Sequence, residues 1–242
     1  MDSSSRHPVG AILAIETSLR QASVCVTTPE GGRQEHLPME LPTTQTLVPT
    51  VARLLEQTGC PVNELSCVVV DCGPGSFTGL RIGLTFAKTF CFAAQIPVIG
   101  VSSLRVLTEQ YVTAERVDRE AFNVIGVSDA QRKQFFAAGF HFDRAGLREQ
   151  FPPQLVDEAW LAAMCGEGWV LVGPVVDRLK QQGFLANLDS AARSNHRQAI
   201  PLAGSLAEIA KQRLADGQLD DLWTLKPLYL RPSAAEEKAA SA

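Results

Sequence analysis

The sequence has little of what metal, disulfide or membrane proteins need. It holds four histidines, and no two have H-x-x-x-H spacing, which argues against a helical zinc pair. None of its six cysteines forms a C-x-x-C pair, and most lie in apolar runs, as do reduced, buried thiols. No apolar run approaches the ~20 residues that span a bilayer, and the leader at residues 1–8 has no signal-peptide core. We therefore expect a cytoplasmic protein with a disordered leader.

An excess of positive charge is also missing. The formal net charge is −4 in 242 residues, whereas chains that bind nucleic acid on their own are usually basic. We expect the lone chain to bind RNA weakly. Because 45% of the residues are hydrophobic and 20% are charged, the composition is that of an ordinary globular protein.

Residues 71–83, DCGPGSFTGLRIG, are rich in glycine but match none of three common motifs. A P-loop needs a second glycine and a lysine where Thr78 and Gly79 stand. A dinucleotide-binding fingerprint needs its third glycine one residue before Gly79. A nucleophile elbow needs glycines where Pro74 and Thr78 flank Ser76. What remains is a corner between a strand and a helix.

The corner joins an apolar strand at 67–71 to a helix predicted over 79–95. Ser76 or Thr78 can cap this helix. Two interpretations stay open at this point. The free N–H groups of the first turn, with Arg81, can hold an anion, or the glycines only allow a tight turn and close packing of helix on strand.

The chain repeats itself. Residues 12–26 and 124–138 each read as a strand, a polar turn with an acid, and a second strand, and the acids are Glu16 and Asp129. The Gly-Pro corner recurs at 173–174. The repeat predicts two related α/β lobes that join between residues 102 and 119. We expect a first lobe over 9–103, with a helix at 202–217 as a candidate addition to it, a second lobe over 104–231, and a disordered tail over 232–242.

The predicted layout, βββαβαβα in each lobe with the second one shorter, is that of actin, sugar kinases and Hsp70, the actin-like (ribonuclease H-like) α/β fold. In that architecture ATP lies between the lobes, and acids at the first turn of each lobe hold its metal. Glu16 and Asp129 are thus candidates for such a site. One hypothesis is an autonomous ATP-dependent phosphotransferase that uses both acids. Another is a metallopeptidase, against which the missing H-x-x-x-H argues.

Three stretches carry a more specific resemblance: ILAIETS at 12–18, GPGSFTGLRIG at 73–83 and YLR at 229–231. Together they resemble the TsaB (YeaZ) family over residues 11–232. The resemblance implies a non-catalytic paralogue and partner of TsaD. With the ATPase TsaE, that complex transfers a threonylcarbamoyl group to the adenosine beside the anticodon of tRNAs reading ANN codons.

The resemblance also implies where cofactors and partners belong. TsaD would carry the metal, the ATP and the active site, so we expect no catalytic residue, cofactor or metal in this chain alone, with nucleotide at the complex interface left open. Expected partners are TsaD, TsaE and, without TsaD, a second copy; tRNA would bind only through the complex. Glu16 and Asp129 then become remnants of a lost site.

The family motif loop would mainly pack the corner. It comprises Gly73, Pro74, Gly75, Ser76, Phe77, Thr78, Gly79 and Arg81. This sequence departs from the family's D-A-R turn, because it reads Asp129-Ala130-Gln131 with Arg132 one place later. That departure puts in doubt an anion contact by the family's arginine.

The helix at 79–95 is apolar on nearly all sides, so both the face toward the sheet and the opposite face need to be covered. The resemblance implies helix-on-helix pairing with TsaD, which makes the helices at 43–59 and 79–95 a partner interface. The alternative is that other helices of this chain cover it. The candidate interface residues are Leu47, Val51, Leu54, Ile82, Phe86 and Phe90.

Overall fold

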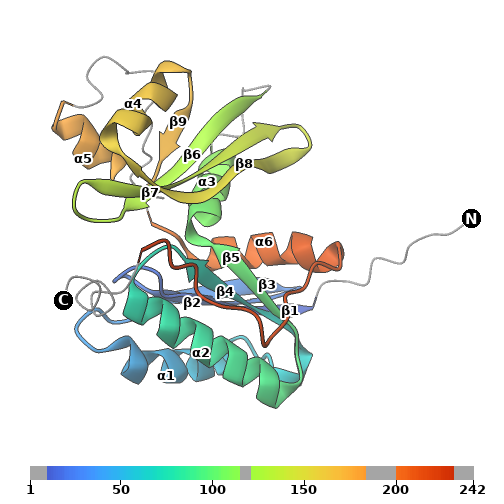
Figure 1. The fold of residues 1–242 in the computed structure, drawn as a ribbon. Helices are drawn as coiled ribbons and strands as arrows, with labels where there is room; N and C mark the ends of the chain where they lie inside the picture. Colours follow the sequence, from blue (N-terminus) through green and yellow to red (C-terminus); the bar gives the residue numbers. More distant parts are fainter. Residues whose placement is uncertain (1–9, 115–120, 184–199, 232–242) are drawn as a thin grey trace, which may run out of the picture. The chain divides into compact units, whose positions relative to one another are not determined.

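The computed structural model describes residues 10–114, 121–183 and 200–231, so the predicted leader and tail lie outside the described residues. The chain divides into two compact units, each built on one sheet (Figure 1). The first unit takes in residues up to 72, residues 78–101 and residues 202–227. The second takes in 73–77, 102–201 and the residues from 228 onward.

The sheet of the first unit has five strands in the order β3-β2-β1-β4-β5. β1 pairs antiparallel with β2 and parallel with β4, which puts β1 in the middle of the sheet. All six residues of β1 are buried, which explains its uninterrupted apolar run. The strands are β1 (Ala11–Glu16), β2 (Ser23–Thr28), β3 (Gly31–His36), β4 (Leu65–Gly73) and β5 (Val98–Ser102).

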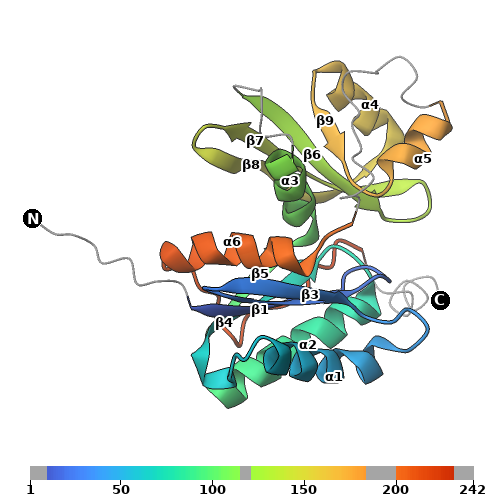
Figure 2. The same ribbon diagram turned by 180° about the vertical axis from the view of Figure 1, so that it is seen from behind.

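Helices cover both faces of this sheet. Figures 1 and 2 show α1 (Thr43–Gln57) and α2 (Phe77–Ala94) side by side on one face and α6 (Ala203–Ala215) on the other. The first turn of α6 is held by side chains of two strands: the Ser23 hydroxyl accepts from the Ala203 N–H at 3.0 Å, and Gln34 Oε1 accepts from the Gly204 N–H at 2.7 Å. These bonds satisfy N–H groups that a helix start leaves open.

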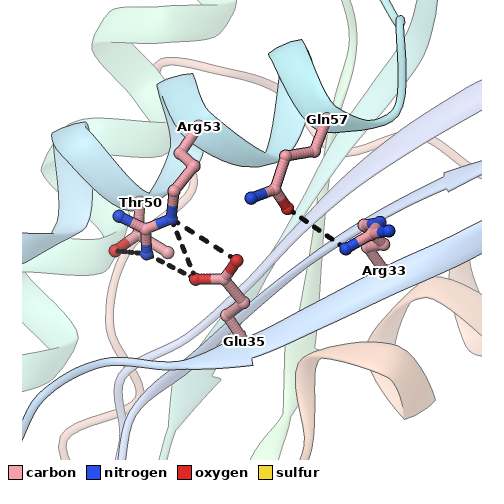
Figure 3. Close-up of polar contacts among 5 residues, drawn as sticks. All are labelled: Arg33, Glu35, Thr50, Arg53 and Gln57. Carbon is pink, nitrogen blue, oxygen red and sulfur yellow. Dashed lines mark hydrogen bonds and ion pairs between the residues drawn. The ribbon is translucent and has the colours of Figure 1, made fainter.

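Polar contacts hold α1 on the edge strand β3 (Figure 3). Arg53 forms an ion pair with Glu35, and Arg33 donates to Gln57 Oε1 at 3.4 Å. The residues of β3 are mostly exposed. Charged side chains on this edge strand therefore also disfavour its pairing with a strand of another molecule. A short 3₁₀ turn, η1 (Val62–Glu64), leads from α1 into β4.

The opposite edge, β5, is covered by the segment after α6. The Asp220 N–H donates to the Val98 carbonyl at 3.1 Å, and Asp220 Oδ2 accepts from the Gly100 N–H at 2.7 Å. Arg213 donates to the Gly100 carbonyl at 2.7 Å and pairs with Asp220 at 3.2 Å. A distant piece of sequence thereby completes the first unit.

The second unit repeats this plan in shorter form. Its sheet has the order β8-β7-β6-β9, with β6 antiparallel to β7 and parallel to β9. Its apolar residues divide between two clusters, one under α3 and one under α4 and α5, so helices lie on both faces. The elements are β6 (Phe122–Asp129), β7 (Gln134–Asp143), β8 (Gly146–Asp157), β9 (Val170–Val172), α3 (Ser103–Ala114), α4 (Glu158–Gly166) and α5 (Val176–Gln181).

The duplicated α/β plan predicted from the sequence is confirmed, and so is the shorter second lobe. In the part of the chain that the structure describes, the second sheet has four strands and the first has five. Residues 103–114, to which the sequence analysis assigned no element, form α3. Eight of its twelve residues are buried, so α3 lacks the clear amphipathic stripe that marks a helix in sequence.

Candidate functional site

The first predicted acid, Glu16, lies at the end of β1 and is fully buried. Its Oε1 accepts a hydrogen bond from the Ser18 N–H at 2.7 Å and another from the Ser18 hydroxyl. Its Oε2 is buried and has no hydrogen-bond partner among the described residues. The carboxyl group is thus held on one side only.

A second carboxyl group lies beside it. Asp71 is in β4, where the parallel pairing of Ile15 with Val70 brings it next to Glu16, and it is also fully buried. Burial, and then the charge of Asp71, raise the pKa of Glu16 well above its ordinary value, while the bonds from Ser18 oppose this. Sequence reasoning missed Asp71, although it is an acid in an otherwise apolar strand.

The second predicted acid, Asp129, has a different environment. It ends β6 in the second unit, its side chain is 39% exposed, and it pairs with Arg178 at 2.7 Å. Its other oxygen accepts from the Gln131 N–H at 2.7 Å. Burial alone would raise the pKa of Asp129, but the bonds from Arg178 and Gln131 and the charge of Arg178 lower it.

Neither acid is part of a larger cluster. Within the described residues, no three His, Cys, Asp or Glu side chains come together in a way that could hold a metal ion. All six cysteines are free and buried, and burial raises the pKa of Cys72 to about 12. At neutral pH such a thiol stays protonated, whereas the thiolate is the form that acts as a nucleophile.

Two of the stretches that carry the family resemblance meet in the first unit. The Thr17 hydroxyl donates to the Gly79 carbonyl at 2.8 Å. A Cβ added at Gly83 would lie 2.2 Å from Thr17 Oγ1. The helix α2 therefore packs directly on the end of β1, and the glycine at 83 makes this approach possible.

The rest of the motif loop meets the YLR stretch in the second unit. The Ser103 hydroxyl donates to the Pro74 carbonyl at 3.0 Å, and the Phe77 ring stacks on Tyr229 with centroids 4.4 Å apart. Arg231 donates to the Ala130 carbonyl and, at 2.7 Å, to Gln134 Oε1. In these contacts the motif residues stabilise the turns of the second unit.

The helix boundary decides between the two predicted caps. Because α2 begins at Phe77, Ser76 stands at the cap position, whereas Thr78 lies inside the first turn. Gly73, at φ 97°, has a backbone conformation that favours glycine. An anion site at this helix start stays a prediction. Arg81 is among the residues that line a groove beside α2.

The groove lies between α1 and α2 and has a volume of about 450 Å³. Phe86 forms part of its wall and stacks on Phe90 with centroids 5.6 Å apart. Val48, on its rim, is 55% exposed. The lining combines apolar side chains with three threonines and one arginine: Thr44, Leu47, Val48, Arg81, Ile82, Thr85, Phe86 and Thr89.

The predicted interface residues fall into two groups. Leu47, Val51 and Leu54 are almost fully buried in the core between α1 and the sheet, and Leu47 also lines the groove. Their part in a partner interface stays a prediction. The half-buried residues of α2, Ile82, Phe86 and Phe90, pack against the same core. Sequence reasoning missed Val48, because it lies off the apolar stripe that α1 turns toward the sheet.

Comparisons with known proteins agree with the motifs. The family model described as "TsaD: tRNA N6-adenosine threonylcarbamoyltransferase" matches residues 42–238. A protein of *Bacillus subtilis* named tRNA threonylcarbamoyladenosine biosynthesis protein TsaB is 32% identical over 203 residues, which are 79% of this chain and 80% of that protein. This chain belongs to the TsaB (YeaZ) family. The TsaB of *Escherichia coli* is 28% identical over 236 residues, 94% of this chain and 97% of that one.

The fold of the family is also the fold of this chain. The solved structure of YeaZ from *Pseudomonas aeruginosa* superposes with a TM-score of 0.72 and covers 91% of this chain and 100% of its own, at 22% identity. The actin-like, ribonuclease H-like fold expected from the sequence is thus confirmed. As to membranes, the described helices include none with the length and hydrophobicity of a membrane span.

Proposed function

We propose that this TsaB-family chain is the non-catalytic partner of a TsaD-type protein. Together with TsaE, that complex would transfer a threonylcarbamoyl group to the adenosine beside the anticodon of tRNAs reading ANN codons. Membership of the family gives a role in tRNA threonylcarbamoyladenosine biosynthesis. The observation that carries the finer proposal is the solvent-open apolar groove between α1 and α2.

A groove between two parallel-packed helices suits another helix. Ridges of side chains on one helix fit between the ridges of its neighbours. Covering the apolar wall at Phe86 lowers the free energy, because this apolar surface is removed from water. A TsaD-type paralogue would bring helices of the same kind. In its absence, a second copy of this chain would occupy the same groove.

The state of the two acids supports a non-catalytic role. An autonomous phosphotransferase would need both carboxylates open to a metal and ATP. Asp129 is instead committed to Arg178 and Gln131, and Glu16 is buried beside Asp71 with a raised pKa, which disfavours its charged form.

The partner proposal is tested with a charge in the groove. Val48→Asp places a carboxylate on an exposed rim residue, so the chain should fold normally but bind a TsaD-type partner at least tenfold more weakly. Val62→Asp, at another exposed valine of the same unit, is the matched control. Co-expression with the TsaD protein of the same genome, size exclusion and titration calorimetry measure the effect. Wild-type affinity in Val48→Asp and in the second groove variant, Phe86→Asp, would refute the groove as the interface.

The non-catalytic part of the proposal has its own test. The purified chain alone should hydrolyse no ATP and transfer no threonylcarbamoyl group, and at about 150 mM salt it should bind tRNA only weakly because its net charge is −4. Turnover by the lone chain that disappears in Glu16→Ala or Asp129→Ala would support the phosphotransferase instead.

A further inference from the structure

An exposed aromatic pair stands at the C-terminal end of α2. Trp223 is 72% exposed and Phe92 is 54% exposed, and their rings meet edge to face with centroids 5.6 Å apart. We name these two residues the aromatic platform. Two large adjoining rings in water are costly, so a contiguous pair of this kind marks an interaction site more often than a single exposed ring does.

The backbone under Trp223 is fixed rather than loose. Lys88, on α2, donates from Nζ to the carbonyls of Trp223 at 3.3 Å and Leu225 at 2.9 Å. Asp221 Oδ1 accepts from the N–H groups of Trp223 at 3.0 Å and Thr224 at 2.7 Å. A platform held in this way loses little conformational entropy when a partner covers it.

The segment that carries Trp223 is anchored on the sheet at both ends. Before it, Asp220 bonds to Val98 and Gly100 of β5. After it, Leu225 lies so close to β5 that a Cβ added at Gly100 would be 2.6 Å from its Cδ1. The exposure of Trp223 is therefore a feature of a tightly attached strap.

The aromatic platform continues the groove. Thr85 and Thr89 of α2 line the groove, and Phe92 follows Thr89 by three residues, so it lies one turn farther along the same helix. The α2 helix has 18 residues and is about 27 Å long. A partner helix that lies in the groove along α2 would reach Phe92 and Trp223 at its end.

We propose that the aromatic platform is a second anchor of the same interface and is covered by an apolar side chain of the TsaD-type partner. This inference rests on the function proposed above for the groove. Its chemistry is that of an interface hot spot, because it is an exposed tryptophan whose backbone is held in place, here by Lys88 and Asp221.

The experiment measures partner binding by the full-length chain with the platform removed. Trp223→Ala and Phe92→Ala should each weaken binding of the same-genome TsaD protein at least tenfold, with unchanged melting temperatures, because both side chains are mostly exposed. Val62→Ala, an exposed apolar residue outside the platform and the groove, should bind like the wild type.

A second readout does not depend on truncation. Trp223→Phe keeps a ring on the platform and leaves the other two tryptophans, Trp160 and Trp169, in place. Subtracting its fluorescence from that of the wild type isolates Trp223. Partner binding should shift this difference spectrum to the blue as the indole leaves water.

The outcomes separate this inference from the proposed function. If Val48→Asp abolishes binding while Trp223→Ala and Phe92→Ala bind like the wild type and the spectrum does not shift, the platform inference is wrong and the groove stands. If none of the three variants changes binding, both are wrong. If Trp223→Ala lowers self-association of the chain but leaves TsaD binding intact, the occupant is a second copy, which also overturns the inference.

Discussion

The two units place an acid at the end of their first strand and use it in opposite ways. Glu16 points into the first unit, where it is buried beside Asp71 and bonded to Ser18. Asp129 is partly exposed and bonded to Arg178 in the second unit. Two acids that stand one position apart in the alignment of the sequence repeat thus have pKa values shifted in opposite directions. The repeat therefore keeps the backbone plan but not the side-chain environment.

The turn after each strand explains the difference. In the first unit, Thr17 packs against α2, with Gly83 and Gly79 as its neighbours, so the turn is pressed onto a helix. In the second unit the turn carries three consecutive residues with positive φ, at positions 131–133, and two of them are cations exposed to water. One turn is part of a core and the other is part of a surface.

The largest effect is expected where the first turn meets α2. Gly83→Ala would bring a methyl group against Thr17, which must turn away and give up its bond to Gly79. We expect the free energy of unfolding to fall by about 2–3 kcal/mol, as for overpacked cores, in urea titrations followed by circular dichroism. Gly166→Ala in α4 of the second unit has open space around it and is the control, with no loss expected. Equal stability of the two variants would contradict the packing argument.

The next effect tests the buried hydrogen bonds. Ser18→Ala removes the hydroxyl donor to Glu16 but leaves the Ser18 N–H in place. Because a buried acceptor then loses a partner, stability should fall by about 1–2 kcal/mol. Ser18→Thr keeps a hydroxyl and serves as control. An unchanged urea midpoint in Ser18→Ala would show that the hydrogen bond from the Ser18 hydroxyl to Glu16 contributes no more to stability than a bond in an exposed turn.

The pH dependence of stability should separate the two acids by sign. The pKa of Glu16 is raised on folding, so its contribution is full below its ordinary value of 4.5 and is lost as pH rises from there through the raised value. Glu16→Gln should therefore remove a decline in stability toward high pH. The pKa of Asp129 is lowered, so its contribution is present above 3.8 and is lost as pH falls below that value. Asp129→Asn should remove a decline in stability toward acid pH. If both substitutions changed the slope of unfolding free energy against pH in the same direction, the comparison would be contradicted.

The smallest effect is expected at the surface partner. Arg178→Ala breaks the ion pair with Asp129, in which the two side chains are 47% and 39% exposed. Water and salt screen such a pair, so the loss should be below about 1 kcal/mol and should shrink further in high salt. Arg178→Lys, which retains the charge, is the control. A loss as large as that of Ser18→Ala would mean that Asp129 holds its unit together as Glu16 does.

The sequence predicted the parts of the fold that local pattern dictates. The apolar runs at β1 and β4 and the repeat of strand, acidic turn and strand were sufficient for the α/β class and the duplication. The helix predicted at 202–217 corresponds to α6, but its place on β1 and β2 depends on bonds from Ser23 and Gln34, which lie 180 and 170 residues away from their partners in the sequence. No local pattern encodes such a partner.

The candidate sites show the same limit more sharply. Leu47, Val51 and Leu54 share an apolar face, and the sequence could not tell what this face meets. The structure buries all three in the core of the first unit, and Leu47 also lines the groove. Asp71 reads as the end of a strand until parallel pairing places it beside Glu16.

The sequence by itself determined the family, the fold class and the absence of the common phosphate and zinc motifs, because residue identity and spacing along the chain are enough for these. Only the tertiary structure decided which acid is buried, which valine borders the groove and that Trp223 stands beside Phe92. Each of these depends on segments far apart in the chain that pack together, and burial and electrostatics are properties of that packing rather than of any stretch of sequence.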